Sequence, residues 1–469
     1  MTPFMASRLP ALILAAYSLL LGGLMVLSGR IPARANYDHK LYHEPTIRQF
    51  AEQWPHIDLW HYKSATTPGY HLLQAAVATI ISPSLLALQL TAMAITAALS
   101  YLLGRALVRH APPLLAVALG LPLASSIYIA QSSAYLLPDN LGWLGVLGML
   151  LLVLRPRQTA GVLLGAAAVL LALVMVRQIH AWTAGLLWLG AWLNSVETPG
   201  GPLLNPRAIF HEPTAQARRA LLALLATLPA LVLLALFYRY WGGLVPPVFQ
   251  GWYHSGNAAG VVFVLAVFGA FSPFFLVSWW PGLRTLWAEH RLSAAVILLL
   301  LLVVACAVPT THDLPAGRFS GLWNLAAKLP VVGHCSPFMV GLGVLGAVCL
   351  LSLAARLDPR TRLIFLGGVL GYGAACTANH DLFQRYVEPL ALMLLALMSA
   401  MSLRGPVAIG RHAVGPLVLA AAFVAMTTLT LIKASVPIDG PPPAARSPQD
   451  PPVPAELPRP ELPPGKRFF

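Results

Sequence analysis

Charged residues are scarce in this sequence. Asp, Glu, Lys and Arg together make up 10% of the 469 residues, whereas hydrophobic residues make up 58%. A soluble chain of this length could not hide so much apolar surface, but a lipid bilayer accepts it. Open strands would leave backbone groups unpaired in lipid, so helices are expected to span it. The composition therefore predicts an all-α protein whose core lies in the membrane.

Basic runs and cysteines at metal-binding spacing are also missing. The formal net charge is +14, but most arginines stand alone where apolar segments end. Such arginines anchor topology and meet anionic membrane lipid, so nucleic acid is not expected as a partner. None of the four cysteines has a metal-ligand spacing, and Cys306, Cys349 and Cys376 lie in apolar runs, which predicts small core residues.

Apolar runs fill most of the chain, and many of them have a length that can cross about 30 Å of hydrocarbon as a helix. They predict a polytopic transmembrane helical bundle of about 13 spans. The runs cover residues 9–29, 84–104, 112–130, 136–154, 159–176, 181–194, 219–238, 258–279, 292–309, 336–355, 362–377, 387–403 and 413–432. The first run resembles a signal sequence, but no small-residue cleavage site follows it, which favours a retained helix.

The connections between the runs predict the organisation of the chain. We expect residues 1–435 to form one transmembrane domain with a large first outer loop at about 30–71. The Pro-rich residues 436–469 are expected to form an extended tail without regular structure, on a side that the span count leaves open. With the N-terminus inside, the short inner loops carry mainly Arg and Pro, and most acidic residues fall outside.

The outer segments differ in kind from the inner ones, because each carries His, Asp, Asn, Gln, Tyr or Trp. They are residues 36–71, 131–140, 177–182, 238–257, 310–337 and 378–389. This asymmetry predicts that polar chemistry is gathered on the outer face of the membrane.

Asp38 lies in the first outer loop, after the expected exit of the first span. A carboxylate fixed near a low-dielectric boundary is a candidate general base. The structural alternative is a solvated loop acid or a helix cap. Asp38, His39, His43 and Glu44 could also hold a divalent metal, although their spacing gives no specific ligand pattern. A metal near Asp38 therefore stays open, and no cofactor is required.

Among the arginines of the outer segments, three are candidates for a shared role: Arg177, Arg318 and Arg385. An outward-facing guanidinium can bind the phosphate of a lipid donor. The structural alternatives are that Arg177 extends to the interface, and that Arg385 pairs with Asp381 or Glu388 about one turn away. A single interpretation covers all three arginines: together they would bind the donor phosphate.

Further outer residues have hydrogen-bonding or aromatic side chains that suit a sugar ring or a phosphate. The candidates for donor or acceptor contacts are His43, Lys63, Tyr70, His71, Gln178 and His254.

Residues 37–45 (Tyr-Asp-His-Lys-Leu-Tyr-His-Glu-Pro) and residues 66–70 (Thr-Thr-Pro-Gly-Tyr) resemble the first-loop pattern of a known family. It is the α-1,2-glucosyltransferase family that uses dolichyl-phosphate-glucose in N-glycan precursor assembly, and Arg177-Gln178 resembles its Arg-Gln at a span end. The resemblance implies a GT-C fold, a sugar donor linked to polyprenyl phosphate, and Asp38 as the catalytic acid of the loop. The family commonly has Asp-Glu where this chain has Asp38-His39.

We therefore expect a hexosyltransferase that moves a sugar, glucose in the resembling family, to a hydroxyl of a lipid-linked or cell-envelope glycan, with inversion. The Ala-, Leu-, Pro- and Arg-rich composition would suit a GC-rich bacterial genome, which would place the protein in an inner membrane with a periplasmic active face. One alternative is a lipid or glycolipid transporter or flippase without transferase activity. Another is an inactive membrane scaffold.

Overall fold

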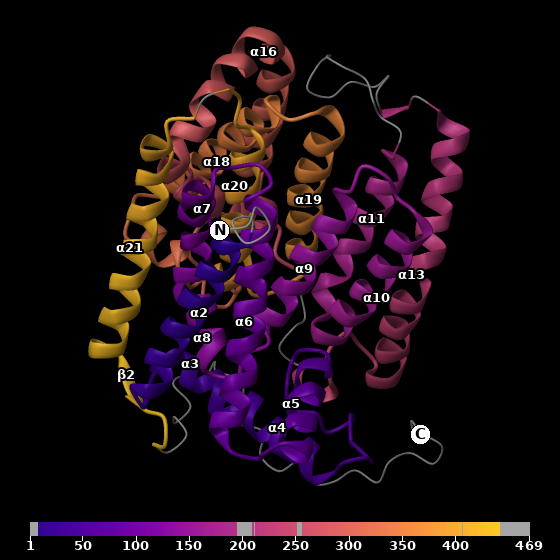
Figure 1. Cartoon of the computed structure of the whole chain (residues 1–469), viewed down its shortest axis with the longest axis vertical. Coiled ribbons are helices and arrows are strands. Elements are labelled where there is room, and N and C mark those ends of the chain that lie inside the picture. Colours follow the sequence, from indigo (N-terminus) through magenta and orange to yellow (C-terminus); the bar gives the residue numbers. More distant parts are fainter. Residues whose placement is uncertain (1–7, 195–208, 211, 251–255, 406, 441–469) are drawn as a thin grey trace.

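The computed structural model describes residues 8–194, 209–210, 212–250, 256–405 and 407–440. Most of these residues are helical, and many of the long helices run side by side along the long axis of the molecule (Figure 1). This confirms the all-α prediction.

The N-terminal part holds the first long helix and the structured first loop. Its elements are α2 (Leu9–Leu27), β1 (Arg30–Pro32), α3 (Ala33–Asp38), the π-helical turn η1 (His39–His43), α4 (Glu44–Glu52) and α5 (Gly69–Ile80).

The middle of the chain follows with α6 (Leu85–Leu107), α7 (Pro113–Ser125), α8 (Ile127–Ala134), α9 (Asp139–Val153), α10 (Ala160–Val176), η2 (Gln178–Trp182), α11 (Thr183–Trp192) and α13 (Pro213–Trp241). The C-terminal part contains α14 (Pro247–Gln250), α15 (Gly260–Phe271), η3 (Ser272–Phe275), α16 (Leu276–Ala307), α17 (Leu322–Ala326), α18 (Pro337–Ala355), α19 (Pro359–Thr377), α20 (Gln384–Met401), α21 (Ile409–Lys433) and β2 (Ser435–Pro437).

In the described residues, six helical segments are long and apolar enough to cross a membrane, and a seventh is counted if α7 and α8, bent by 64° at their break, form one span. The number of thirteen spans is not confirmed. A helix lies in each predicted apolar run, but α9, α10 and Arg291–Ala307 have only 10–17 residues. At a rise of about 1.5 Å per residue, such helices fall short of about 30 Å of hydrocarbon. The apolar helices indicate a multi-pass protein embedded in the membrane, with fewer full spans in the described residues than predicted.

Small residues allow the helices of the core to approach closely. α15 and α18 pack against each other, and a Cβ at Gly269 would overlap the Leu342 carbonyl, as one at Gly346 would overlap that of Leu265. Close approach through small residues is the usual way in which helices associate in lipid.

The cysteines follow the core prediction only in part. Cys349 and Cys376 are buried as predicted, but Cys306 is exposed. Most residues around it in the last turns of α16 are exposed as well, because this half of α16 touches its neighbours along a narrow stripe. The apolar run therefore identified a helix there, and the burial of Cys306 was wrongly predicted.

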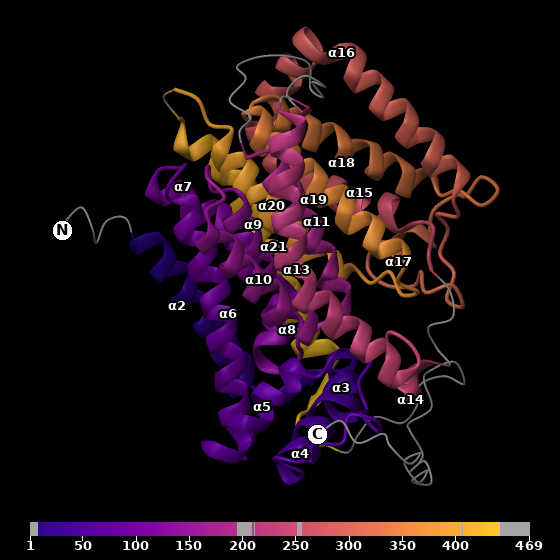
Figure 2. The same cartoon turned by 90° about the vertical axis from the view of Figure 1, so that its right-hand side faces the viewer.

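The first loop and the end of the last helix lie at the same end of the molecule. α3, α4, α5 and β2 gather at the lower end of Figure 1, and the bend of α16 lies at the opposite end (Figures 1 and 2). β1 and β2 pair antiparallel, with Ile31 opposite Val436. Because β2 follows α21 directly, the chain leaves its last helix on the side of the first loop. Of the predicted tail, residues 441–469 lie outside the described part.

Candidate active site

Asp38 and Arg385 form an ion pair that joins the first loop to a helix near the end of the chain. Asp38 is the last residue of α3 and Arg385 the second of α20, 347 positions later. Nη1 of Arg385 donates a hydrogen bond to Oδ2 of Asp38, and each side chain is 19% exposed. Burial is the largest single influence and raises the pKa of Asp38, but the charge and hydrogen bond of Arg385, together with other nearby groups such as Arg34, hold that pKa below its usual value.

Arg385 does not form the alternative local ion pair with Asp381 or Glu388, because it pairs with Asp38 instead. Glu388 instead accepts hydrogen bonds from the Ser126 hydroxyl at 2.6 Å and from Nε2 of Gln384 at 2.8 Å. Ser126 lies at the break between α7 and α8. Glu388 therefore fixes the first turn of α20 against this break, which positions Arg385.

A second ion pair lies beside the first. Arg177, the residue that ends α10, donates from Nη1 to Oδ1 of Asp139 at the start of α9. Both arginines contact the Tyr386 ring, whose centre is 4.3 Å from the guanidinium carbon of Arg177 and 4.9 Å from that of Arg385. Such contacts stabilise a cation through the aromatic face. The structure thus brings together Asp38, Arg177 and Arg385.

Arg34 is a third arginine of this cluster and was not among the residues predicted from the sequence. Its guanidinium carbon lies 4.8 Å from the ring centre of Phe383 and 5.5 Å from that of Phe319. The side chain is exposed, and no carboxylate of the described residues lies within ion-pair distance of it. Its position four residues before Asp38, on the same face of a helix, was a signal that could have identified it.

A series of hydrogen bonds begins at His43, at the end of the turn that follows Asp38. The π-helical turn η1 lengthens the usual repeat, and π-turns are often found at functional sites. Nδ1 of His43 lies 2.9 Å from Nε2 of His71, and Nδ1 of His71 lies 2.7 Å from the Tyr62 hydroxyl. All three side chains are buried.

Burial also determines the charge of the two histidines. It lowers the pKa of His43 to about 4 and that of His71 well below its usual value. Both rings are therefore neutral at pH 7, and each carries one N–H. Each hydrogen bond from His43 through His71 to Tyr62 must then be donated in the same direction. These bonds fix the two rings relative to Tyr62.

The residues considered for a metal are engaged separately. Nδ1 of His39 lies 3.0 Å from the Tyr135 carbonyl oxygen, and its Nε2 lies 3.3 Å from Glu44. Glu44 also accepts from Arg48 at 2.6 Å. Within the described part of the chain, no three His, Cys, Asp or Glu side chains are grouped as metal ligands. His39 and Glu44 therefore join each other rather than Asp38.

The Thr-Pro-Gly segment of the first loop is attached to the end of α10. Nε2 of Gln178 donates to the Ala65 carbonyl at 2.9 Å, and the Thr67 hydroxyl donates to the Val174 carbonyl at 2.6 Å. These bonds fix the loop beside Arg177. Gln178 thus has a positioning contact in this structure.

Tyr70 and Lys63 flank this segment. Tyr70 is buried, and its hydroxyl accepts from Nε2 of Gln74 at 3.0 Å. Lys63 is half-buried, and no described acidic side chain pairs with it.

The contacts of Arg318 lie within its own loop and do not include the two ion pairs. It donates to the Thr311 carbonyl at 2.9 Å and to Asp313 at 3.1 Å, both within its own loop. Its guanidinium therefore holds that loop, and the neighbouring Phe319 reaches Arg34. His254 lies outside the described residues.

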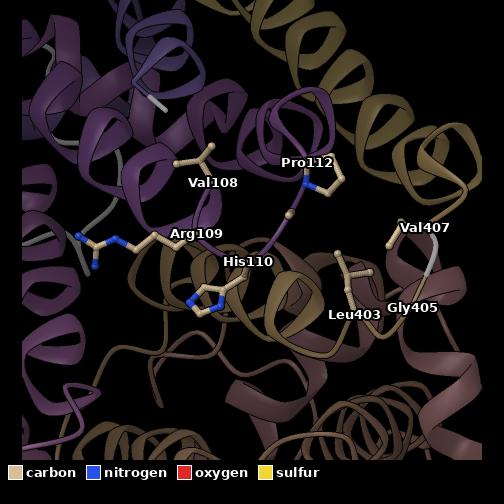
Figure 3. A pocket seen from close by; sticks show the side chains of 8 residues that line it. Val108, Arg109, His110, Pro112, Leu403, Gly405 and Val407 are labelled. Atoms are coloured by element: carbon tan, nitrogen blue, oxygen red, sulfur yellow. The ribbon is translucent and has the colours of Figure 1, made fainter. Parts of the chain in front are cut away.

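A surface cavity of about 420 Å³ lies at the opposite end of the bundle from Asp38, between the turn joining α6 to α7 and the turn joining α20 to α21 (Figure 3). It is lined by Val108, Arg109, His110, Ala111, Pro112, Leu403, Gly405 and Val407. None of these residues belongs to the predicted site, and Arg109 extends away from Leu403 and Val407. The clustered chemistry and this cavity are therefore separate features.

Comparisons of the chain with protein-family models, with curated proteins and with solved structures find no match.

Proposed function

We propose that this protein is a membrane glycosyltransferase. It transfers a hexose from a polyprenyl-phosphate carrier to an acceptor hydroxyl at the membrane face that carries the first loop. The observation that supports this proposal is the meeting of Asp38 with Arg385 and Arg177 around Tyr386. A carboxylate beside two arginines combines a base with groups that bind phosphate.

The proposed reaction is a direct displacement. The acceptor hydroxyl gives its proton to Asp38 while its oxygen forms a bond to the anomeric carbon. The bond from that carbon to the phosphate oxygen breaks, and its electron pair leaves with the polyprenyl phosphate. Arg385 and Arg177 stabilise the negative charge of the leaving phosphate. One displacement inverts the anomeric centre, and its electron balance requires no metal or cofactor.

The test is sugar transfer in proteoliposomes from a labelled polyprenyl-phosphate-hexose to extracted envelope glycolipids. Asp38→Asn keeps the shape of the side chain and removes the base, so transfer is expected to fall by about 100-fold or more. Glu52→Gln is the matched control, because Glu52 is an exposed acid of the same loop outside the cluster. Equal transfer by the native chain and Asp38→Asn would overturn the base assignment. No transfer from any prenyl-linked donor would overturn the class.

A lipid or glycolipid transporter is the second candidate, and buried Glu388 in α20 is the observation that favours it. Ionisable side chains inside a helical bundle often mark transport paths. Glu388 is bonded to Ser126 and Gln384. A transporter would move a labelled prenyl glycolipid between leaflets without breaking its glycosidic bond, so product analysis in the same proteoliposomes distinguishes the two functions.

A further inference from the structure

The proposed base is paired with an arginine in this structure. That pair must open before the carboxylate can act as a base. Asp38 accepts a hydrogen bond from Arg385, the residue proposed to bind the leaving phosphate. A carboxylate paired with a guanidinium is a weaker base than an unpaired one. Arg385 therefore has two possible anionic partners, Asp38 and the phosphate.

We propose that the donor phosphate binds first at Arg34, then takes Arg385 from Asp38, and so releases Asp38 as a base only in the donor-bound protein. This inference rests on the proposed function for the identity of the lipid. It adds the entry residue, Arg34, and the event that activates Asp38.

Arg34 is suited to the first contact because it is exposed and its guanidinium is held by aromatic rings. The Phe383 ring also lies 5.4 Å from the guanidinium carbon of Arg385, so one ring has both arginines around it. A phosphate at this ring can therefore accept from both. The rings of Phe319 and Phe383 offer apolar surface to the first units of a prenyl chain.

Asp139 is already paired with Arg177, and another acid near these arginines offers weaker competition for them. Burial raises the pKa of Asp381, the acid that precedes α20, so its charged form is disfavoured. No ion pair joins Asp381 to a described arginine. The phosphate therefore competes mainly with Asp38 for Arg385.

The geometry of α3 also suits an exchange. Arg34 and Asp38 lie four residues apart on one helix, so they are separated by about 6 Å along its axis. Both side chains therefore lie on the same face of α3, so a phosphate held by Arg34 and Arg385 would lie beside the carboxylate that Arg385 releases.

The experiment measures binding of polyprenyl phosphate, which carries no sugar, to the full chain in nanodiscs. Arg34→Gln is expected to weaken binding by about tenfold or more. Arg30→Gln is the matched control, since exposed Arg30 bonds to Ser435 outside the cluster and should leave the affinity unchanged. Asp38→Asn removes the competitor for Arg385 and is expected to tighten binding by roughly 5-fold or more, which a misfolded variant cannot do.

Unchanged binding by Arg34→Gln would overturn the entry site, and unchanged or weaker binding by Asp38→Asn would overturn the exchange. Equal, Arg34-dependent binding of phosphatidylglycerol would overturn the assignment to a prenyl donor, because it would show a general lipid contact. Tighter binding by Asp38→Asn without sugar transfer by the native chain would support the exchange and overturn the proposed function. Asp38-dependent transfer without tighter binding by Asp38→Asn would support the proposed function and overturn the exchange.

Discussion

The folded protein lowers the pKa of Asp38, and its stability should therefore depend on pH. Burial opposes the charged form of Asp38 in the folded protein, but Arg385 and the other groups around it, Arg34 among them, together stabilise that form more. A group whose pKa is lower folded than unfolded stabilises the protein above its unfolded pKa of about 3.9, and this contribution is lost as the pH falls towards the folded value. The pair should therefore stabilise the fold at neutral pH and lose its effect below about pH 4.

This gives a prediction for thermal unfolding, followed by tryptophan fluorescence in detergent between pH 3 and 7. The unfolding temperature of the native chain should fall more steeply below about pH 4 than that of Asp38→Asn, and Glu52→Gln should follow the native curve. Parallel curves for the native chain and Asp38→Asn would mean that the ion pair does not stabilise the folded state.

Several site residues could be identified from the sequence because their chemical type was unusual for their position. Asp38, Arg177 and Arg385 are polar groups at the ends of apolar runs, and the structure brings them into one cluster. Asp139 and Arg34 were missed as members of it. The role of Asp139 depends on its distant partner Arg177, which a single sequence does not show, whereas the place of Arg34 one helical turn before Asp38 was a signal that was overlooked.

At the scale of elements, the first loop depends on how closely α5 begins beside α10. A Cβ at Gly69 would lie 2.7 Å from the Met175 carbonyl oxygen, which no ordinary contact allows. The loop would have to move away from α10, and it would take with it the bonds of Thr67 and Gln178. The sequence indicated a turn at this Thr-Pro-Gly segment, but not its contact with α10.

Gly69→Ala is therefore expected to cost about 1–3 kcal/mol and to lower transfer activity. Gly148→Ala is the control: no atom outside its own stretch of α9 lies within 4 Å of a Cβ there, and alanine in the interior of α9 should be neutral or stabilising. The measurements are the unfolding temperature and the transfer rate of both variants. A Gly69→Ala protein as stable and active as Gly148→Ala would contradict the described attachment of the loop.

At the scale of the whole molecule, composition was sufficient to predict an all-α chain embedded in the membrane. It was not sufficient to count spans, because hydropathy marks apolar helices without measuring how far each extends. α7 and α8 form a bent pair, and α9 and α10 are short, so these apolar runs could not be equated with full crossings. The pairing of β1 with β2 was not predictable either, since both strands have only three residues.

The central claim is that Asp38 and Arg385, far apart in the sequence, act as one site. The most direct measurement is the rate of hexose transfer from a polyprenyl-phosphate donor by Asp38→Asn, Arg385→Gln and the double variant. Residues that act as a unit lose activity non-additively, so each single variant should be at least about 100-fold slower and the double variant no slower than the slower single one. Native rates in all three variants, or losses that multiply in the double variant, would contradict the claim.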